Sequence, residues 1–567
     1  MKKFNLSVGL KDILFFVLSA CFVIGFPLKG QVQTSNSDGL HQHKVTPYLK
    51  VVNGITRMMV DDEPFVMLGG ELHNSTSTSE AYFGPLFSGL KNLNLNMVIG
   101  SVSWEQFEPT EGIYNYKQVD ALIRYADANG LKLTLIWFAS WKNGKSSYLP
   151  LWVKRNQRKY LRAKAKESTI TTERSGLEAD FISTFSDATC KADAKAFAAL
   201  MKHIKQVDKN KVVILMQVEN EVGLFQDIDY CKAAQKAYKQ EVPQELLDYL
   251  KLDKKGTWEE VFGASPLTKE KFMAWHYATY INEVAARGKE EYNLPMYVNA
   301  WIMQKPTDLP GTYPNGGPVA RVIDIYKAAA PAIDFVSPDI YLPNLKEVIA
   351  KYHRVDNPLF VPEARIKPEN LFYTIAKHNA LGFSPFGIED GIGDYLYAES
   401  NNVLHQLMPQ LLLYQGKNKV TAFAKNEEEE DEILSFGDYQ LHIHYLSKEE
   451  PCFGLLIQTG KDQFIVSGMN VVVTFVPKDK TTVALVGQIV EGTYDKEGMW
   501  QAGRMLNGDE GVGLKLLKVK GVDHKTAQYD KAIDPNAPVA PDSYSANKWR
   551  TVTTPGIYKV EMYQLKK

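Results

Sequence analysis

From about residue 50 onward, short apolar runs alternate with loops and with longer stretches whose apolar positions follow a helical period. Short runs that are apolar throughout are typical of strands buried on both faces of a parallel sheet. Eight such runs precede residue 400, and they predict strands over 65–72, 96–104, 131–138, 212–220, 295–301, 333–341, 358–365 and 382–390. Eight strands separated by helices predict an α/β fold, a (β/α)8 TIM barrel.

The segments between the expected strands carry helix signals. Over 187–207, apolar residues recur at i, i+3, i+4 and i+7, and a second helix is expected over 269–289 with Thr268 as its N-cap. No glycine-rich fingerprint follows the first strand, which disfavours the alternative of an open dinucleotide-binding sheet. The connection over 139–185 is long for a barrel, so we expect it to form a wall of the site.

The regions that flank the barrel have different patterns. Before it, Asn53-Gly54 is a strong signal for a tight turn and predicts a leading hairpin. Beyond the barrel, period-two segments separated by turns predict an all-β sandwich, and the acidic run over 426–432 is expected to be a solvated loop at its edge. The expected domains are the barrel with its hairpin over 45–415 and the sandwich over 416–567.

The N-terminal residues resemble an export signal. Lys2 and Lys3 precede an apolar stretch over 13–26 that is too short to span a bilayer comfortably. This pattern predicts a signal peptide over 1–30 and an exported protein in the periplasm or at the cell surface. The segment around Cys21 also resembles a bacterial lipoprotein box, so a lipid anchor through Cys21 is the alternative to simple cleavage.

Composition narrows the class of partner. The chain has 567 residues and a formal net charge of −1, which argues against binding to nucleic acid or to an anionic membrane and favours a neutral substrate. Aromatic residues make up 11% of the chain, which suits a ligand with apolar C–H faces, although most such rings fill the core. The cysteines have no metal-like spacing, so we expect neither a zinc site nor a disulfide framework.

Polar residues gather at the carboxyl ends of the expected strands, which meet at one mouth of a barrel. Carboxylates and indoles predominate in this set: Glu71, His73, Trp104, Glu105, Trp137, Trp141, Glu219, Glu221, Asn299, Trp301, Asp339, Tyr341, Glu363, Arg365, Glu389 and Asp390. Metal-ligand histidines are almost absent and the chain has no nucleophile elbow, so we expect no metal and no cofactor. Paired carboxylates with aromatic platforms indicate glycoside hydrolysis. Strand parity places Gln217, Glu219 and Glu221 on one side, so periodicity leaves open which glutamate is catalytic.

A family resemblance narrows this choice. "QVENEVG" (217–223) resembles the acid/base strand of the large clan of barrel glycosidases, and "PLFVPEA" (358–364) resembles its nucleophile strand. "LGGELHNS", "SWEQFEPTEGIYNY" and "ASWKNGKSSYLPLWV" resemble segments of glycoside hydrolase family 35, the retaining β-galactosidases, in a bacterial branch with a short C-terminal sandwich. The resemblance implies that Glu221 is the acid/base, that Glu363 is the nucleophile and that Asn220 donates to the sugar 2-hydroxyl.

Further residues are expected around this pair. An ionised Glu363 should raise the pKa of Glu221, and Tyr341 and Arg365 are candidates to hold Glu363 ionised. Indole faces are expected to form sugar platforms. The expected substrate-binding residues are Asn220, Trp104, Ser140, Trp141, Asn299, Trp301 and Tyr341, and the expected supporting residues are Glu219, Arg365 and Glu71.

Two departures from the family pattern concern specificity. Ser140 stands where the family has a glutamate that contacts sugar hydroxyls, and Asn74 stands where it has a tyrosine. We therefore expect an exported retaining β-galactosidase that acts on terminal β-galactosyl residues of plant-type glycans. The alternatives are another exo-β-glycosidase of the same clan and a non-catalytic glycan-binding protein. The linkage, the natural polymer, the oligomeric state and the role of the sandwich stay open.

Overall fold

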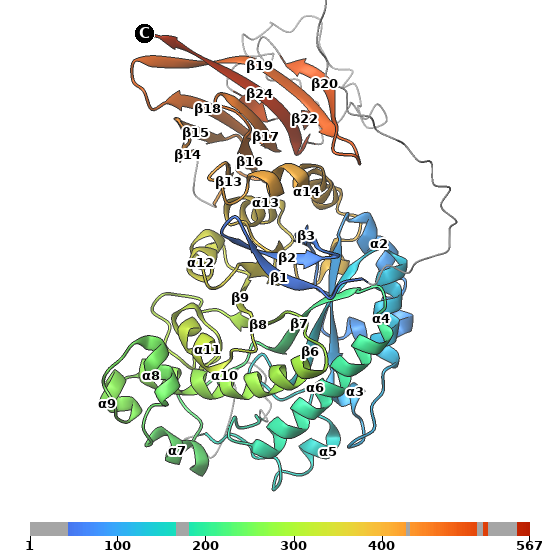
Figure 1. The fold of residues 1–567 in the computed structure, drawn as a ribbon, viewed down its shortest axis with the longest axis vertical. Coiled ribbons are helices and arrows are strands. Elements are labelled where there is room, and N and C mark those ends of the chain that lie inside the picture. The colour runs from blue at the N-terminus through green and yellow to red at the C-terminus, as the bar shows by residue number, and fades with distance from the viewer. Residues whose placement is uncertain (1–43, 166–180, 427–430, 507–513, 517, 520–552) are drawn as a thin grey trace, which may run out of the picture. The chain divides into compact units, whose positions relative to one another are not determined.

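The computed structural model describes residues 44–165, 181–426, 431–506, 514–516, 518–519 and 553–567 (Figure 1). Residues 44–567 form one compact unit. The expected signal peptide over 1–30, with Cys21, lies outside the described residues, as does most of the acidic run. Within the described ranges, no helix is both long and apolar enough to cross a membrane.

The leading hairpin forms as its sequence predicts. It joins β1 (Tyr48–Val52) to β2 (Ile55–Val60), and β3 (Glu63–Phe65) adds a third antiparallel strand. Val52 pairs with Ile55 across the turn, where Asn53 has φ 52° and Gly54 has φ 76°. These left-handed values are what a two-residue hairpin turn of the primed type requires, and asparagine and glycine tolerate them best.

The barrel strands occur at the eight predicted places. They are β4 (Met67–Leu68), β5 (Met97–Ser103), β6 (Lys132–Lys142), β7 (Val213–Asn220), β8 (Met296–Trp301), β9 (Phe335–Ile340), β10 (Phe360–Val361) with β11 (Glu363–Ala364), and β12 (Gly382–Phe383). All pair in parallel, and a parallel bridge between Glu71 and Ile99 joins the first strand to the second and closes the ring. The fold is therefore a (β/α)8 barrel followed by an antiparallel domain, as expected.

Several strand limits differ from the prediction. Pro362 interrupts the seventh strand because it has no N–H to donate to its neighbour. The first strand stops before Gly70, where any side chain would collide with Ile388. The last strand ends at Phe383, and the predicted continuation is instead the 3-10 helix η3 (Ile388–Gly391). Strand β6 is longer than predicted and runs into the expected loop.

Helices cover the outside of the barrel (Figure 1). They are η1 (Thr76–Thr78), α1 (Glu80–Phe83), α2 (Leu86–Asn92), α3 (Trp104–Phe107), α4 (Lys117–Ala128), α5 (Leu151–Lys154), α6 (Asp187–Val207), α7 (Lys232–Tyr238), α8 (Gln244–Leu250), α9 (Trp258–Phe262), α10 (Pro266–Glu291), η2 (Ala320–Val322), α11 (Ile323–Ala329), α12 (Leu345–Tyr352), α13 (Pro368–Lys377) and α14 (Tyr395–Tyr414). Helix α6 has the predicted limits. The cap predicted at Thr268 is wrong: helix α10 starts earlier, because Ser265 accepts the Thr268 N–H and Pro266 fits the first helical position.

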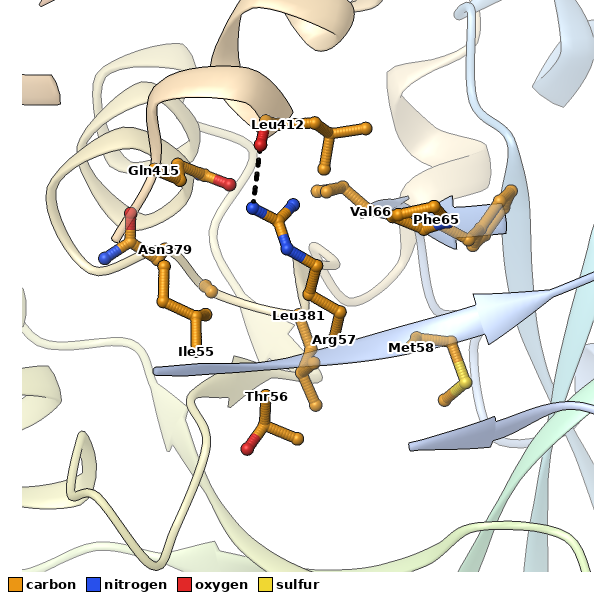
Figure 2. A pocket seen from close by; sticks show the side chains of 12 residues that line it. Ile55, Thr56, Arg57, Met58, Phe65, Val66, Asn379, Leu381, Leu412 and Gln415 are labelled. Atoms are coloured by element: carbon orange, nitrogen blue, oxygen red, sulfur yellow. Dashed lines mark hydrogen bonds between the residues drawn. The ribbon is translucent and has the colours of Figure 1, made fainter. Parts of the chain in front are cut away.

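The hairpin closes the amino-terminal end of the barrel. Met58 and Val60 of β2 join a buried cluster with side chains from the barrel strands, among them Met97, Ile214 and Phe335. On the other side of β2, the buried Arg57 donates from Nη2 to the Leu412 carbonyl oxygen at 3.0 Å (Figure 2). Because Leu412 lies in the last turn of α14, the guanidinium binds the negative end of that helix.

The described part of the C-terminal region forms two large antiparallel sheets and one pair of short strands. One has the order β13 (Val420–Ala424), β16 (Phe453–Gln458), β17 (Gln463–Met469), β24 (Gly556–Lys566), β19 (Thr482–Tyr494) and β20 (Trp500–Leu506). The other has the order β14 (Asp431–Phe436), β15 (Tyr439–Tyr445), β18 (Val471–Pro477) and β21 (Leu514–Leu516), and β22 (Lys518–Val519) pairs with β23 (Thr553–Thr554). The predicted period-two segments are thus strands, whereas β13, β14, β20 and the short strands β21, β22 and β23 were not predicted. Part of the acidic run, from Asp431 onward, belongs to β14.

A single core joins the barrel to this region. Phe372 of α13 packs against Phe453 of β16 with ring centroids 4.7 Å apart. A second buried cluster, which includes Leu441, Val466 and Tyr558, lies between the two sheets. The C-terminal sheets are therefore held against the barrel by apolar packing, and burial of this kind stabilises the folded chain.

Candidate active site

Three carboxyl groups meet at the carboxyl ends of three barrel strands. Glu221 directly follows β7, Asp339 lies in β9 and Glu363 begins β11, and one oxygen from each lies within 4.8 Å of the others. Their exposed fractions are 6%, 3% and 4%. In the described part of the chain, this is the group of side chains whose spacing would suit a cation. That no metal is needed stays a prediction.

Donors from three strands hold Glu363. The Tyr341 hydroxyl donates to Glu363 Oε2 at 2.7 Å, and the amides of Asn220 and Asn299 each donate to Oε1 at 3.2 Å. Burial and the neighbouring Glu363 raise the pKa of Tyr341, so the phenol keeps its proton and remains a donor. Three donors on two oxygens fix the orientation of this carboxyl group.

Glu221 keeps its proton at neutral pH. Burial first and then the charge of Glu363 raise its pKa to about 8, while Lys142 opposes the rise. The backbone N–H of Glu221 donates to Asn299 Oδ1 at 3.0 Å, and the Asn299 amide donates to Asp339 Oδ2 at 2.8 Å. The pKa rise expected from the sequence is thus confirmed in direction. Asn299 binds the carboxyl groups of Asp339 and Glu363 and the backbone of Glu221.

Lys142 is a member of this site that sequence reasoning missed. It lies at the end of β6, is almost fully buried, and donates from Nζ to Asn220 Oδ1 at 2.8 Å. This bond turns the Asn220 amide so that its Nδ2 faces Glu363. Burial lowers the pKa of Lys142, but Glu363 and Glu221 outweigh burial and raise it, so the ammonium supplies the positive charge of the cluster.

Glu71 follows β4 and interacts electrostatically with Glu363, Glu221 and Lys142. It is 1% exposed, and neither of its carboxyl oxygens has a hydrogen-bond partner among the described residues. Burial, followed by the charge of Glu363, raises its pKa well above the usual range. A neutral Glu71 adds no negative charge to the site, which fits the supporting role expected for it.

A second carboxyl pair lies behind β7. Asp193 of α6 and Glu219 are fully buried and bonded to each other. The Glu219 oxygens accept from the N–H groups of Ser140 and Trp141 at 3.1 and 2.8 Å. Burial and the charge of Asp193 raise the pKa of Glu219, so Glu219 carries the shared proton. Glu219 thus supports the strand end.

Ser140 binds this carboxyl pair. We use the name rear cluster for the group formed by Asp193, Glu219, Ser140, Trp137 and Tyr280. The Ser140 hydroxyl donates to Asp193 Oδ2 at 2.6 Å and lies 2.8 Å from the Tyr280 hydroxyl, while Trp137 Nε1 donates to Asp193 Oδ1 at 2.8 Å. Ser140 is fully buried. Its predicted contact with substrate is therefore wrong in this structure.

Two of the three expected sugar platforms are also corrected. Trp104 and Trp141 have no exposed surface. Trp104 Nε1 donates to Glu108 at 2.7 Å, and Trp141 Nε1 donates to the Ile182 carbonyl at 3.2 Å. Both rings fill core, so neither offers a face to a sugar. Trp301 is half-buried and packs edge-on against Phe225.

Arg365 does not contact Glu363. Its Nε donates to the Tyr341 carbonyl oxygen at 3.0 Å, and its side chain is exposed. Arg365 therefore acts on the nucleophile candidate only through the loop that carries Tyr341.

The strand that carries both glutamates ends in an unusual backbone. Glu219 has φ 61° and Glu221 has φ 44°, values that non-glycine residues rarely adopt. These left-handed residues break the strand parity, so Glu219 faces α6 while Glu221 faces Glu363. Strain of this kind persists at functional sites where the surroundings impose it.

A parallel barrel with one protonated glutamate and one fixed carboxyl group within 4.8 Å at its mouth defines a class: a barrel glycosidase. The comparisons agree with this class. Residues 78–265 match the family model of glycoside hydrolase family 42, described as "Beta-galactosidase", and residues 397–516 match a domain of unknown function (DUF5597). No curated protein sequence matches the chain. The protein is a glycoside hydrolase of the barrel-glycosidase clan.

Solved structures that resemble the chain at low identity include three bacterial enzymes. The catalytic domain of β-amylase from Paenibacillus polymyxa is 13% identical with a TM-score of 0.42, over 57% of this chain and 92% of that one. The β-galactosidase of Marinomonas ef1 is 13% identical with a TM-score of 0.44, over 61% and 60%. For the β-galactosidase of Rahnella sp. R3 the values are 16%, 0.43, 61% and 56%. The chain spans less than two thirds of either β-galactosidase.

Proposed function

We propose that this protein is a retaining β-galactosidase that removes terminal β-galactosyl residues from plant-type glycans. The observation that carries the proposal is the pair of Glu221 and Glu363, whose oxygens lie within 4.8 Å. Retaining glycosidases have carboxyl groups about 5–5.5 Å apart, whereas inverting ones leave room for a water molecule between them. The β-galactosidase model over residues 78–265 favours galactose, and membership in family 35 stays a prediction.

The mechanism has two steps. In the first, a Glu363 oxygen forms a bond to the anomeric carbon while Glu221 gives its proton to the departing glycosidic oxygen. In the second, Glu221 takes a proton from water, whose oxygen displaces Glu363 from the anomeric carbon and regenerates both carboxyl groups. Tyr341, Asn220 and Asn299 hold Glu363 for attack. The role of Asn220 at the sugar 2-hydroxyl is part of the proposal.

The position of Ser140 bears on the sugar specificity of the enzyme. Ser140 points into the rear cluster, so the sugar contact that the family glutamate makes at this position must come from elsewhere or be absent. This observation favours a second candidate, another exo-β-glycosidase with the same two glutamates. Export rests on the apolar stretch over 13–26, with release into the periplasm or a lipid anchor at Cys21 as the two outcomes.

Hydrolysis of a panel of 4-nitrophenyl β-glycosides tests this function. We expect the highest kcat/KM on the β-galactoside, with release of β-galactose as the first product in NMR. A clear preference for β-glucoside or another sugar would favour the second candidate. Inactivity on every glycoside, together with binding of oligosaccharide, would favour a glycan-binding protein and contradict the proposal.

A further inference from the structure

A cavity of about 400 Å³ lies beside the candidate active site, between barrel loops and the first strand of the C-terminal region. Its walls come from the loop after β9, the starts of α12 and α13, and the end of β13. Ligand pockets commonly have volumes of about 300–1,000 Å³, so this cavity has room for a sugar unit.

Tyr341 connects the cavity to the nucleophile candidate. Tyr341 lines the cavity, and the same residue donates its hydroxyl to Glu363 at 2.7 Å. Arg365 also lines it, follows Glu363 by two positions, and donates from Nε to the Tyr341 carbonyl oxygen at 3.0 Å. A group bound in the cavity would therefore lie one side chain away from the reacting centre.

The charges in the lining are mostly positive. Among the described residues that line the cavity, the basic ones are Lys346, Arg365, Lys367 and Lys425, and the acidic one is Glu369. Burial raises the pKa of Glu369, which reduces the negative charge it contributes. The cavity therefore differs in charge from the chain as a whole, which is close to neutral.

Most of these cations already have partners. Lys346 pairs with Glu432 at 3.3 Å, Lys367 lies 3.6 Å from Glu369, and Lys425 donates to a backbone carbonyl. Arg365 differs from them, because no carboxylate among the described residues pairs with its guanidinium and its side chain is exposed. A planar guanidinium with free N–H donors matches a carboxylate in both geometry and charge.

We propose that this cavity is a substrate subsite for an acidic sugar, with Arg365 binding the carboxylate of a uronic acid unit on the leaving-group side of the cleaved bond. The inference rests on the proposed function and narrows it, since it selects β-galactosyl residues attached to acidic glycans. Tyr341 and Tyr373 supply aromatic surface, and Asn370 supplies an amide for sugar hydroxyls.

Matched disaccharides test this subsite. β-Galactose is joined through the same hydroxyl, 3 or 4, to either glucuronate or glucose, and kcat/KM is measured for both. We expect the wild type to favour the glucuronate compound by about tenfold at low salt, the size of effect that a charge-assisted contact gives. Because salt screens charges over about 3 Å at 1 M, the preference should shrink as salt is added. No preference at low salt would overturn the proposal.

Variants of Arg365 test whether this residue causes the preference for the glucuronate disaccharide. Arg365→Gln should lower the ratio of the two kcat/KM values about tenfold, and Arg365→Lys should lower it less, because the charge stays but the fork is lost. Arg124→Gln, on the outer surface and paired with Glu80, is the matched control and should leave the ratio unchanged. A change in Arg365→Gln that affects both disaccharides equally would indicate a structural role and overturn the subsite.

The result also separates this inference from the proposed function. If the wild type cleaves the neutral disaccharide but shows no acidic preference, the function holds and the subsite fails. If neither disaccharide is cleaved, calorimetric binding of the glucuronate compound to wild type and Arg365→Gln tests the cavity by itself. Equal affinities, or no binding, would then overturn it.

Discussion

Two buried glutamates lie at the carboxyl end of β7, Glu219 within the strand and Glu221 directly after it, and their surroundings differ. Glu219 faces a helix, and both of its oxygens accept backbone N–H groups while it shares a proton with Asp193. Glu221 faces two other carboxyl groups, and its pKa is raised to about 8. Two glutamates at the end of one strand thus have different environments.

The two groups of carboxyl side chains differ in their access to solvent, and this difference helps to identify the reactive carboxyl group. The rear cluster is buried, because its side chains are at most 3% exposed. We use the name front group for Glu221, Asp339 and Glu363. This group lies next to Tyr341, which is 36% exposed, and near the half-buried Trp301, so a ligand can reach it. Burial alone therefore does not identify a catalytic acid. Access combined with a raised pKa is the better guide, because a general acid must hold its proton and lie within reach of the substrate.

The largest expected effect comes from the front group. Glu363→Gln replaces the nucleophilic carboxylate with a neutral amide of the same shape, so kcat/KM on 4-nitrophenyl β-galactoside should fall by at least about a thousandfold with the melting temperature nearly unchanged. Glu105→Gln is the matched control, because Glu105 also lies at a strand end but pairs with Lys154 and is not part of the front group. An active Glu363→Gln enzyme would remove Glu363 from the mechanism.

The rear cluster should respond in stability. Asp193→Ala leaves the Trp137 N–H without its acceptor and the Glu219 proton without a partner, and each orphaned buried group costs about 1–3 kcal/mol. We expect the free energy of unfolding to fall by about 3 kcal/mol, measured by urea denaturation. Folded enzyme should keep most of its activity. If activity were lost while stability stayed intact, the rear cluster would belong to the chemistry.

Removing the positive charge of Lys142 should shift the pH dependence of kcat/KM. The wild-type kcat/KM should fall as pH rises through about 8, because Glu221 then loses the proton it donates. Lys142 lowers the pKa of Glu221, so Lys142→Met should move this alkaline limb upward by about one pH unit. Lys132→Met, at the other end of the same strand, serves as the control. A limb that stays in place or moves down would contradict the assignment of Glu221.

The smallest effect is expected at Ser140. Its hydroxyl bonds to Asp193 and Tyr280 rather than to substrate, so Ser140→Ala should change kcat/KM less than about threefold. Stability should fall by about 1 kcal/mol, the usual net contribution of one hydrogen bond. A large increase in KM would return Ser140 to the substrate site and blur the distinction between the two clusters.

The sequence predicts the barrel well, because each buried parallel strand is a short apolar run whose signal does not depend on its neighbours. The same pattern places Glu221, Asn299, Tyr341 and Glu363 at strand ends, and the structure brings them together. Their catalytic roles stay predictions. What periodicity supplies is the end of the barrel at which a residue lies, and it does not supply the direction of the side chain.

The errors have physical causes. Strand β6 continues through a register shift between Trp137 and Lys142, which turns Ser140 away from the mouth and brings Lys142 beside Asn220. The left-handed backbone at Glu219 breaks the parity on which its side was judged. Asp193 did leave a signal, because it lies four positions before Phe197 on the apolar face of α6. A charged residue in such a stripe needs a buried partner.

The most direct test of the central claim is hydrolysis of 4-nitrophenyl β-galactoside by wild type and by Glu221→Ala, the variant with and without azide. The account predicts that wild type cleaves this substrate, that the variant is slow, and that azide restores turnover with β-galactosyl azide as the product seen by NMR. This result would establish Glu221 as the acid/base and retention of configuration. An α-galactosyl azide, or a variant as active as wild type, would contradict the account.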